Sequence, residues 1–299
     1  MKKTIQVFAI IFSVITVFSC ESKRDLNGDL LFGLNPTEDD GNDPQPGTKK
    51  YLKKITATDS DGEQSVMIYN YENGKLISAK LEEEGNTEDF SLTYDGDVIT
   101  KLVVKEKEGS DVIISYLDLI YNNGKLTNAS GKMETEGSIE LMRNETSFSY
   151  NNSGIVNKIE TLYKMEDIDN PGQYITTFSM TSEVLFNSNN ISSWKFTTET
   201  ISEPPITIPP IVLLTKFNSY DNMKNPYASF PEAFTLASTH FTTSTNSLMG
   251  LSQNNYKTAA IEVMGTSQNI TINYTYDNDG YPTSATNSDG STIKFEYTN

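Results

Sequence analysis

A hairpin unit recurs along most of the chain and constrains its fold more than any other feature. One copy is the segment 66–71, which ends in Tyr71 and is followed by the turn Asn73-Gly74 and by a new apolar segment at Leu76. A second copy, residues 119–129, has the same order of tyrosine, Asn-Gly and leucine. Asn-Gly supplies the positive φ angles that a two-residue hairpin turn needs. The unit therefore predicts antiparallel hairpins.

Weaker copies of the unit continue to the end of the chain. They follow four further aromatic residues: Tyr94, Tyr150, Phe186 and Tyr276. The four tyrosines from Tyr71 to Tyr150 lie 23, 27 and 29 residues apart, which suffices for two strands and two turns per copy. Apolar residues alternate before the turns, as in the segment 90–94, and this predicts strands with one buried face. We predict an all-β fold, a large curved antiparallel meander of hairpin repeats, either open or closed like a barrel.

Two segments interrupt the repeats. Residues 203–210 contain four prolines, which cannot donate ladder hydrogen bonds, so this segment is predicted to be a long connection or a sheet edge. Residues 218–256 lack the hairpin pattern. Within them, Ser229 and Glu232 have the spacing of a capping box, which predicts a short helix over 233–238. We expect a helical insert near residues 229–238 that closes one end of the sheet.

The start of the chain resembles a bacterial lipoprotein signal. Lys2 and Lys3 precede an apolar run over residues 5–18, which suits a secretory signal and is too short to span a bilayer. Ser19 and Cys20, the only cysteine, then complete a lipobox-like sequence, although Phe18 departs from its usual small or aliphatic residue. The alternatives are an ordinary signal cut by a different peptidase and a buried core thiol. A core thiol is disfavoured, because nothing before Cys20 could form a domain.

These observations divide the chain into three parts. Residues 1–19 are predicted to be a lipoprotein signal peptide, and residues 20–48 a disordered acidic tether rich in charge and in chain-breaking residues. Residues 49–299 are predicted to form the repetitive antiparallel β domain. Acyl chains on Cys20 would anchor the protein without a spanning helix.

The net charge excludes some partners. It is −17 for the whole chain, and removal of Lys2 and Lys3 with the signal leaves 21 basic residues and a charge of −19. Nucleic-acid binding depends on neutralising phosphates, so it is disfavoured, as is electrostatic adhesion to anionic lipid. The predicted membrane contact is therefore through the acyl chains on Cys20 alone. No disulfide framework is available with one cysteine.

Two family resemblances follow from particular stretches. The last unit, residues 274–297, resembles the tyrosine-aspartate repeats of bacterial wall-associated and toxin-shell proteins. The stretches YDNMKNPY at 220–227 and LSQNN at 251–255 are similar to a family of bacterial cell-envelope lipoproteins of unknown function with a porin-like β fold. This second resemblance covers about 250 residues after the tether. It implies a fold and a compartment, and it transfers no catalytic residue.

Residues that carry common chemistries are scarce. His240 is the only histidine, so it cannot complete the usual zinc site, and no Gly-x-Ser-x-Gly elbow accompanies it; we expect a surface or packing role. No phosphate-binding Gly-rich loop is present. The acidic segments 59–63 and 277–280 resemble fragments of calcium loops, but hairpin turns explain them better. No metal or cofactor is predicted.

Trp194 and Phe196 are the candidate residues for a ligand site. Two aromatic rings on one sheet face can bind sugar rings, although such rings more often belong to a core. Carboxylates are plentiful, and a glycosidase needs only two at a suitable separation. Sequence cannot place such a pair.

We favour a sheet that stands in water over a barrel that spans the membrane. Spanning strands need about nine to eleven residues with an apolar lipid-facing band; many strands here are expected to be shorter or to carry charge in mid-strand, as at Lys158 and Glu160. The sequence thus predicts a lipid-anchored outer-membrane protein of a Gram-negative envelope, on either membrane face. It would be a non-catalytic binding or structural module for a glycan or an envelope protein. The alternative is a polysaccharide-acting enzyme with a carboxylate pair on the sheet face.

Overall fold

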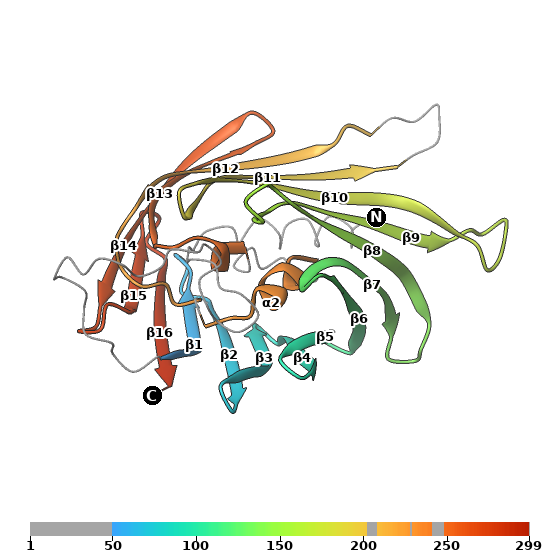
Figure 1. The fold of residues 1–299 in the computed structure, drawn as a ribbon, viewed down its shortest axis with the longest axis horizontal. Coiled ribbons are helices and arrows are strands. Elements are labelled where there is room, and N and C mark those ends of the chain that lie inside the picture. Colours follow the sequence, from blue (N-terminus) through green and yellow to red (C-terminus); the bar gives the residue numbers. More distant parts are fainter. Residues whose placement is uncertain (1–49, 202–207, 228, 241–247, 299) are drawn as a thin grey trace.

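The chain forms a closed antiparallel β-barrel. The computed structural model describes residues 50–201, 208–227, 229–240 and 248–298. Within these ranges, each strand pairs with its neighbours in the sequence, and β16 pairs with β1 to close the barrel (Figure 1). The predicted all-β meander is confirmed, and of its two forms the barrel is the one adopted. The predicted signal peptide, Cys20 and the tether lie outside the described residues.

The strands alternate in direction around the wall. Their bounds are β1 Tyr51–Thr58, β2 Gln64–Glu72, β3 Lys75–Glu83, β4 Asn86–Asp95, β5 Val98–Glu108, β6 Asp111–Asn122, β7 Lys125–Thr135, β8 Glu140–Tyr150, β9 Val156–Glu166, β10 Tyr174–Asn187, β11 Asn190–Thr200, β12 Ile211–Tyr220, β13 Tyr256–Val263, β14 Thr266–Tyr276, β15 Pro282–Asn287 and β16 Thr292–Thr298. The proline-rich segment falls between β11 and β12, as a connection, and only part of it is described.

The Asn-Gly turns lie together at one end of the barrel, as their hairpins require. Asn73 and Asn123 have φ angles of 51°, and the glycines that follow them have φ angles of 78° and 77°. The tyrosine before each turn ties one hairpin to the next: the Tyr121 hydroxyl donates to the Ile99 carbonyl at 2.8 Å, and Tyr150 donates to Leu126 at the same distance. At these two repeats, the tyrosine therefore links the repeat to the preceding one.

The segment between β12 and β13, residues 221–255, folds into this end of the barrel (Figure 1). We call it the insert, and we call the two ends of the barrel the insert end and the far end. The insert contains α2 (Glu232–Ala237) and two 3-10 helices, Ser238–His240 and Leu248–Leu251. The predicted helix is confirmed. Its predicted cap is wrong, because Pro231 occupies the N-cap position and makes no side-chain cap bond.

Ser229 is used differently from the prediction. Its Oγ accepts a hydrogen bond from the Leu52 backbone N–H at 3.4 Å and lies 3.3 Å from the Tyr71 hydroxyl. The serine thus fastens the insert to β1 and β2 instead of starting the helix. The side chains of the insert complete the core: Phe234 meets Phe90 edge-on with ring centroids 6.2 Å apart.

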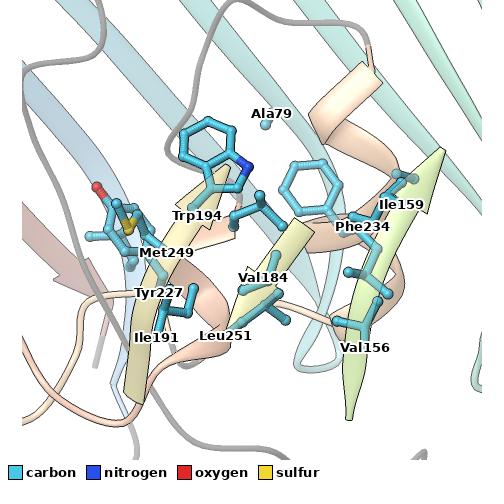
Figure 2. Close-up of a cluster of buried hydrophobic side chains, with 14 of the residues drawn as sticks. Ala79, Val156, Ile159, Val184, Ile191, Trp194, Tyr227, Phe234, Met249 and Leu251 are labelled. Atoms are coloured by element: carbon cyan, nitrogen blue, oxygen red, sulfur yellow. The ribbon is translucent and has the colours of Figure 1, made fainter. Parts of the chain in front are cut away.

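The hydrophobic core lies between the insert and the inner wall. Figure 2 shows the Trp194 ring among Val184, Phe234 and Met249, with Ala79 nearby from another part of the wall. Leu236 of α2 is fully buried. At the insert end, the barrel is therefore filled by its own chain.

The outer wall is polar and carries ion pairs in mid-strand. Lys195 of β11 faces Glu183 of β10 at 2.7 Å, and Lys216 of β12 reaches Glu262 of β13 at 2.7 Å. Exposed apolar side chains such as Ile120 and Leu185 are scattered singly among them. The expected short strands are β1, β13, β15 and β16, with six to eight residues, whereas β4–β12 each have 10 to 14. The expected mid-strand charge is confirmed.

The helices that the structure describes are too short and too polar to cross a membrane.

Candidate ligand-binding site inside the barrel

The inner wall changes character along the barrel. Its insert end is apolar, whereas the wall toward the far end includes buried polar side chains on neighbouring strands. They are Ser115, Asn144, Thr146, Thr161, Ser182, Thr198 and Thr215. Some of these satisfy one another, as Thr146 and Thr161 do through hydroxyl oxygens 3.0 Å apart. Others have no such partner, and they mark the region where a ligand would find hydrogen-bonding groups.

Two glutamates face each other on this part of the inner wall. Glu88 of β4 and Glu106 of β5 are register partners, so their Cβ atoms lie about 4.5–5.5 Å apart, as in any directly opposed antiparallel pair. Glu88 alternates in phase with buried Phe90, and Glu106 with buried Val104. This phase directs both carboxylates inward, and we call them the lumenal acid pair.

The pair is partly shielded from water, and its ionisation changes accordingly. Burial, followed by the charges of Glu106 and Glu83, raises the pKa of Glu88 to about 8. Burial raises the pKa of Glu106 to about 7. Removing a carboxylate from water disfavours its charged form, and a second nearby carboxylate adds repulsion. Near neutral pH the pair therefore carries less than its full charge.

Three further inward-facing side chains extend the candidate site from the acid pair along the inner wall. Ser115 of β6 lies diagonally beside Glu106 on the inner face, since its register partner is Val104. Tyr163 of β9 faces Glu106 closely enough for the carboxylate charge to raise the pKa of the tyrosine, after the larger effect of burial. Asn144 of β8 is the register partner of Tyr163. The site thus draws on β4, β5, β6, β8 and β9.

Several polar atoms of this site lack hydrogen bonds. Among the described residues, the Glu88 Oε2, Ser115 Oγ and Asn144 Oδ1 atoms are buried and have no hydrogen-bond partner. Ser115 is 0% exposed and Asn144 2%. A buried polar atom without a partner costs about 1–3 kcal/mol, so native proteins keep few of them. Three on one stretch of inner wall indicate a place where another molecule can donate hydrogen bonds.

The structure places the sequence-predicted candidates away from this site. Trp194 packs in the core beside Phe196, with ring centroids 6.0 Å apart, and it is 6% exposed. Such burial favours the packing role that the sequence also allowed. The sugar-binding role of Trp194 and Phe196 stays a prediction. His240 ends a 3-10 helix of the insert, next to a segment outside the described residues.

The two acidic loop fragments are hairpin turns. Asp59 Oδ1 accepts the backbone N–H groups of Asp61 and Glu63, both at 2.9 Å. Asp277 does the same for Asp279 and Tyr281. The turn interpretation is confirmed for both segments. In the part of the chain that the structure describes, no three His, Cys, Asp or Glu side chains are grouped closely enough to hold a metal ion.

Sequence reasoning missed the acid pair, although a signal for it was present. The alternation of Phe90, Leu92 and Tyr94 extends backward to Glu88, which shares the phase of the buried residues. A charged residue in the apolar phase of a strand marks a candidate functional position. Its partner Glu106 could be assigned only with the register between β4 and β5.

Comparison with known proteins agrees with the fold. No family model and no curated protein matches the sequence. Among solved structures, the chain is similar to a porin-like protein from Bacteroides vulgatus, with a TM-score of 0.51 and 13% identity over 84% of this chain and 99% of that one. A porin-like protein from Bacteroides uniformis gives a TM-score of 0.48 and 15% identity, over 83% and 96% of the two chains. At this level of identity, the likeness shows the barrel fold alone.

Proposed function

We propose that this protein is a lipid-anchored, non-catalytic binding protein of the bacterial cell envelope. Its barrel lies in the aqueous phase beside the membrane and is anchored by acyl chains on Cys20. It binds its ligand inside the barrel, in the half toward the far end. The observation that carries the proposal is the division of polarity between the two faces of the wall: the outer face bears paired charges, and the inner face bears unpartnered acceptors.

The outer face argues against burial of the barrel in a bilayer. A lysine or arginine on the lipid-facing side of a barrel costs about 2–4 kcal/mol at the membrane midplane. Here Lys54 faces Glu296 at 3.2 Å and Lys101 faces Asp118 at 3.6 Å, in addition to the mid-strand pairs of β10–β13. Lys158 and Glu160 of β9 form another such pair, at 3.1 Å. A barrel with these side chains outside is suited to water.

The compartment rests on the start of the sequence. The basic residues, the apolar run and Cys20 have the order of a lipoprotein signal, and the acidic segment 20–48 is long enough to hold a domain away from the membrane. The porin-like protein from Bacteroides vulgatus shares the barrel fold, which is consistent with an envelope protein.

Cell fractionation tests the anchoring. We would replace residues 1–20 with a secretory signal that is cleaved without lipidation, and compare this chain with the natural one. We expect the natural chain in the membrane fraction and the anchor-free chain in the soluble periplasmic fraction. Recovery of the anchor-free chain from carbonate-washed membranes would show that the barrel itself is inserted, and would overturn the proposal.

A polysaccharide-acting enzyme is the second candidate, because the acid pair is a carboxylate pair on the concave sheet face. The raised pKa of Glu88 would suit a general acid. However, glycosidase carboxylates flank the scissile bond from two sides, whereas Glu88 and Glu106 lie side by side on one wall. Along the inward positions of β8–β13, the described residues include no carboxylate. This arrangement favours binding over hydrolysis.

A hydrolysis assay separates the two functions. The purified protein is incubated with a panel of envelope and plant polysaccharides, and new reducing ends are measured for the natural chain and for Glu88→Gln. We expect no release above the level of Glu88→Gln. Release that depends on Glu88 would establish the enzyme instead.

A further inference from the structure

Part of the inner wall carries acidic charge that faces no basic side chain among the residues that the structure describes. Glu83, Glu88 and Glu106 lie on the consecutive strands β3, β4 and β5, and the carboxylates of Glu83 and Glu106 both act on Glu88. Within strands β3–β10, apart from the residues next to the turns, the described lysines and the arginine share the phase of the outer face. Many of them form ion pairs there. Among the described residues of these strands, none supplies a positive charge to the inward carboxylates.

The unpartnered atoms add an independent indication of what is missing. Asn144 Oδ1 is an acceptor, Glu88 Oε2 is an acceptor when ionised, and Ser115 Oγ can accept. Asn144 and Ser115 are almost wholly buried. A ligand group that donates several hydrogen bonds and carries positive charge would satisfy these acceptor atoms. An ammonium group has three donors and one charge.

We propose that the lumenal acid pair binds the primary ammonium group of a small organic cation, with Ser115 and Asn144 as neighbouring acceptors. This inference rests on the proposed binding function and names its ligand class. Glu88 and Glu106 are both partly exposed, which gives a ligand access to them. The occupant is of polyamine type, because one flexible chain with a second ammonium group can also reach Glu83 at the edge of the same wall.

Ion pairing with the ligand is coupled to proton release. The cation binds the ionised carboxylates, whose pKa values are about 8 for Glu88 and about 7 for Glu106 in the empty site. Affinity therefore rises with pH until both groups are ionised. The titratable groups facing the pair are Glu83 on β3 and Tyr163 on β9. Burial raises the pKa of Glu83 as well, so ionisation of Glu83 also makes the affinity for the cation rise with pH.

Isothermal titration of the full chain in a neutral detergent tests the proposal. The probe is putrescine, and butanediol, which has hydroxyls in place of both ammonium groups, is the matched control ligand. We expect putrescine to bind at least about tenfold more tightly than butanediol, equivalent to about 1.4 kcal/mol. We expect the double variant Glu88→Gln, Glu106→Gln to lose this preference. Glu82→Gln, the same change on the outer face of β3, should retain it.

Three results would overturn the proposal. They are equal binding of putrescine and butanediol, unchanged binding by the double variant, or an equal loss in Glu82→Gln, which would indicate general charge attraction. Thermal unfolding of each variant shows whether the barrel is intact, and Glu106→Gln alone provides a milder test. Binding of a neutral oligosaccharide that requires Asn144 would refute the cation while leaving the binding function standing. The titration measures ligand binding by the barrel itself, so its result does not depend on whether the anchoring experiment succeeds.

Discussion

Gly131 lies where the backbones of β6 and β7 approach too closely for a side chain. It lies on the inner face of β7, and a Cβ built at this position would be 1.8 Å from the carbonyl oxygen of Tyr116 and 2.9 Å from its carbonyl carbon. Both atoms belong to the backbone of β6, which cannot move aside as a side chain would. Glycines at such points let neighbouring strands approach closely where a sheet bends.

We expect Gly131→Ala to destabilise the barrel strongly. The added methyl group must push β6 away from β7, and overpacking of this kind costs about 1–3 kcal/mol or more. Gly137→Ala is the matched control, since its Cβ would meet only the Thr135 hydroxyl at 3.7 Å. Chemical denaturation measures the free energy of unfolding of both variants. Equal stability of the two would show that the close approach of β6 is not maintained in solution.

At the residue scale, the sequence predicts features that depend on neighbouring residues in the chain, but it does not predict contacts between residues of different strands. Asn73-Gly74 is recognisable because its turn needs only the two residues themselves. The hydrogen bond from Tyr121 to Ile99 and the role of Gly131 depend on which residue of the next strand lies opposite. The meeting of Glu88 with Glu106 is of this second kind, which is why the site was not predicted.

At the scale of elements, the insert determines what the insert end of the barrel can hold. Its aromatic residues contact one another in series: the Phe230 ring lies tilted against Tyr69 at 4.6 Å and edge-on to Phe234 at 5.6 Å between ring centroids. Phe234 in turn meets Phe90 of β4. These contacts connect the insert to β4, the strand that carries Glu88. We therefore expect loss of the insert's packing to change the position of β4 at the candidate site.

We expect Phe234→Ala to lower the free energy of unfolding by about 3–5 kcal/mol, the usual range for a buried phenylalanine. The side chain is 5% exposed and fills space between α2 and the wall. Ile168→Ala, in the β9–β10 loop, removes a large apolar side chain that is 93% exposed and should change stability little. Thermal unfolding of both variants provides the comparison. A small loss in Phe234→Ala would mean that the insert is not docked in the barrel.

The insert also shows where prediction of an element fails. The helix near 229–238 was predicted from a cap signal and is present, yet the cap itself is absent. The helix forms because its apolar residues, among them Phe234 and Leu236, are buried against the wall. Short helices take most of their stability from such packing. Packing partners that come from distant strands are invisible in the local sequence.

At the scale of the whole molecule, closure of the barrel depends on the longest-range pairing in the chain. Tyr51 at the start of β1 pairs with Thr298 at the end of β16. Repeats spaced by 23 to 29 residues predict hairpins equally well for an open sheet and for a barrel. The polarity of the outer face, in contrast, was readable from Lys158 and Glu160, because alternation alone assigns them to the face opposite Ile159.

Closure also places the acid pair on a partly buried inner wall, where burial raises the pKa values of both carboxyl groups, and this makes the stability of the barrel depend on pH. The pKa values of Glu88 and Glu106 in the folded barrel, about 8 and about 7, lie above the ordinary value of 4.5 that applies to the unfolded chain. Between these values the folded state holds more protons than the unfolded state. The contribution of the pair to stability therefore falls as pH rises from about 4.5 to about 8.

Replacing both glutamates with glutamine removes this dependence, because glutamine has no charge to bury. We expect the double variant Glu88→Gln, Glu106→Gln to unfold at a higher temperature than the natural chain at about pH 8.5, and the difference to shrink toward about pH 5, where the folded chain keeps both protons. Glu82→Gln on the outer wall should change little at either pH, since Glu82 pairs with Lys80 in water. A difference between the double variant and the natural chain that is constant with pH would show that the two carboxylates are hydrated inside the barrel.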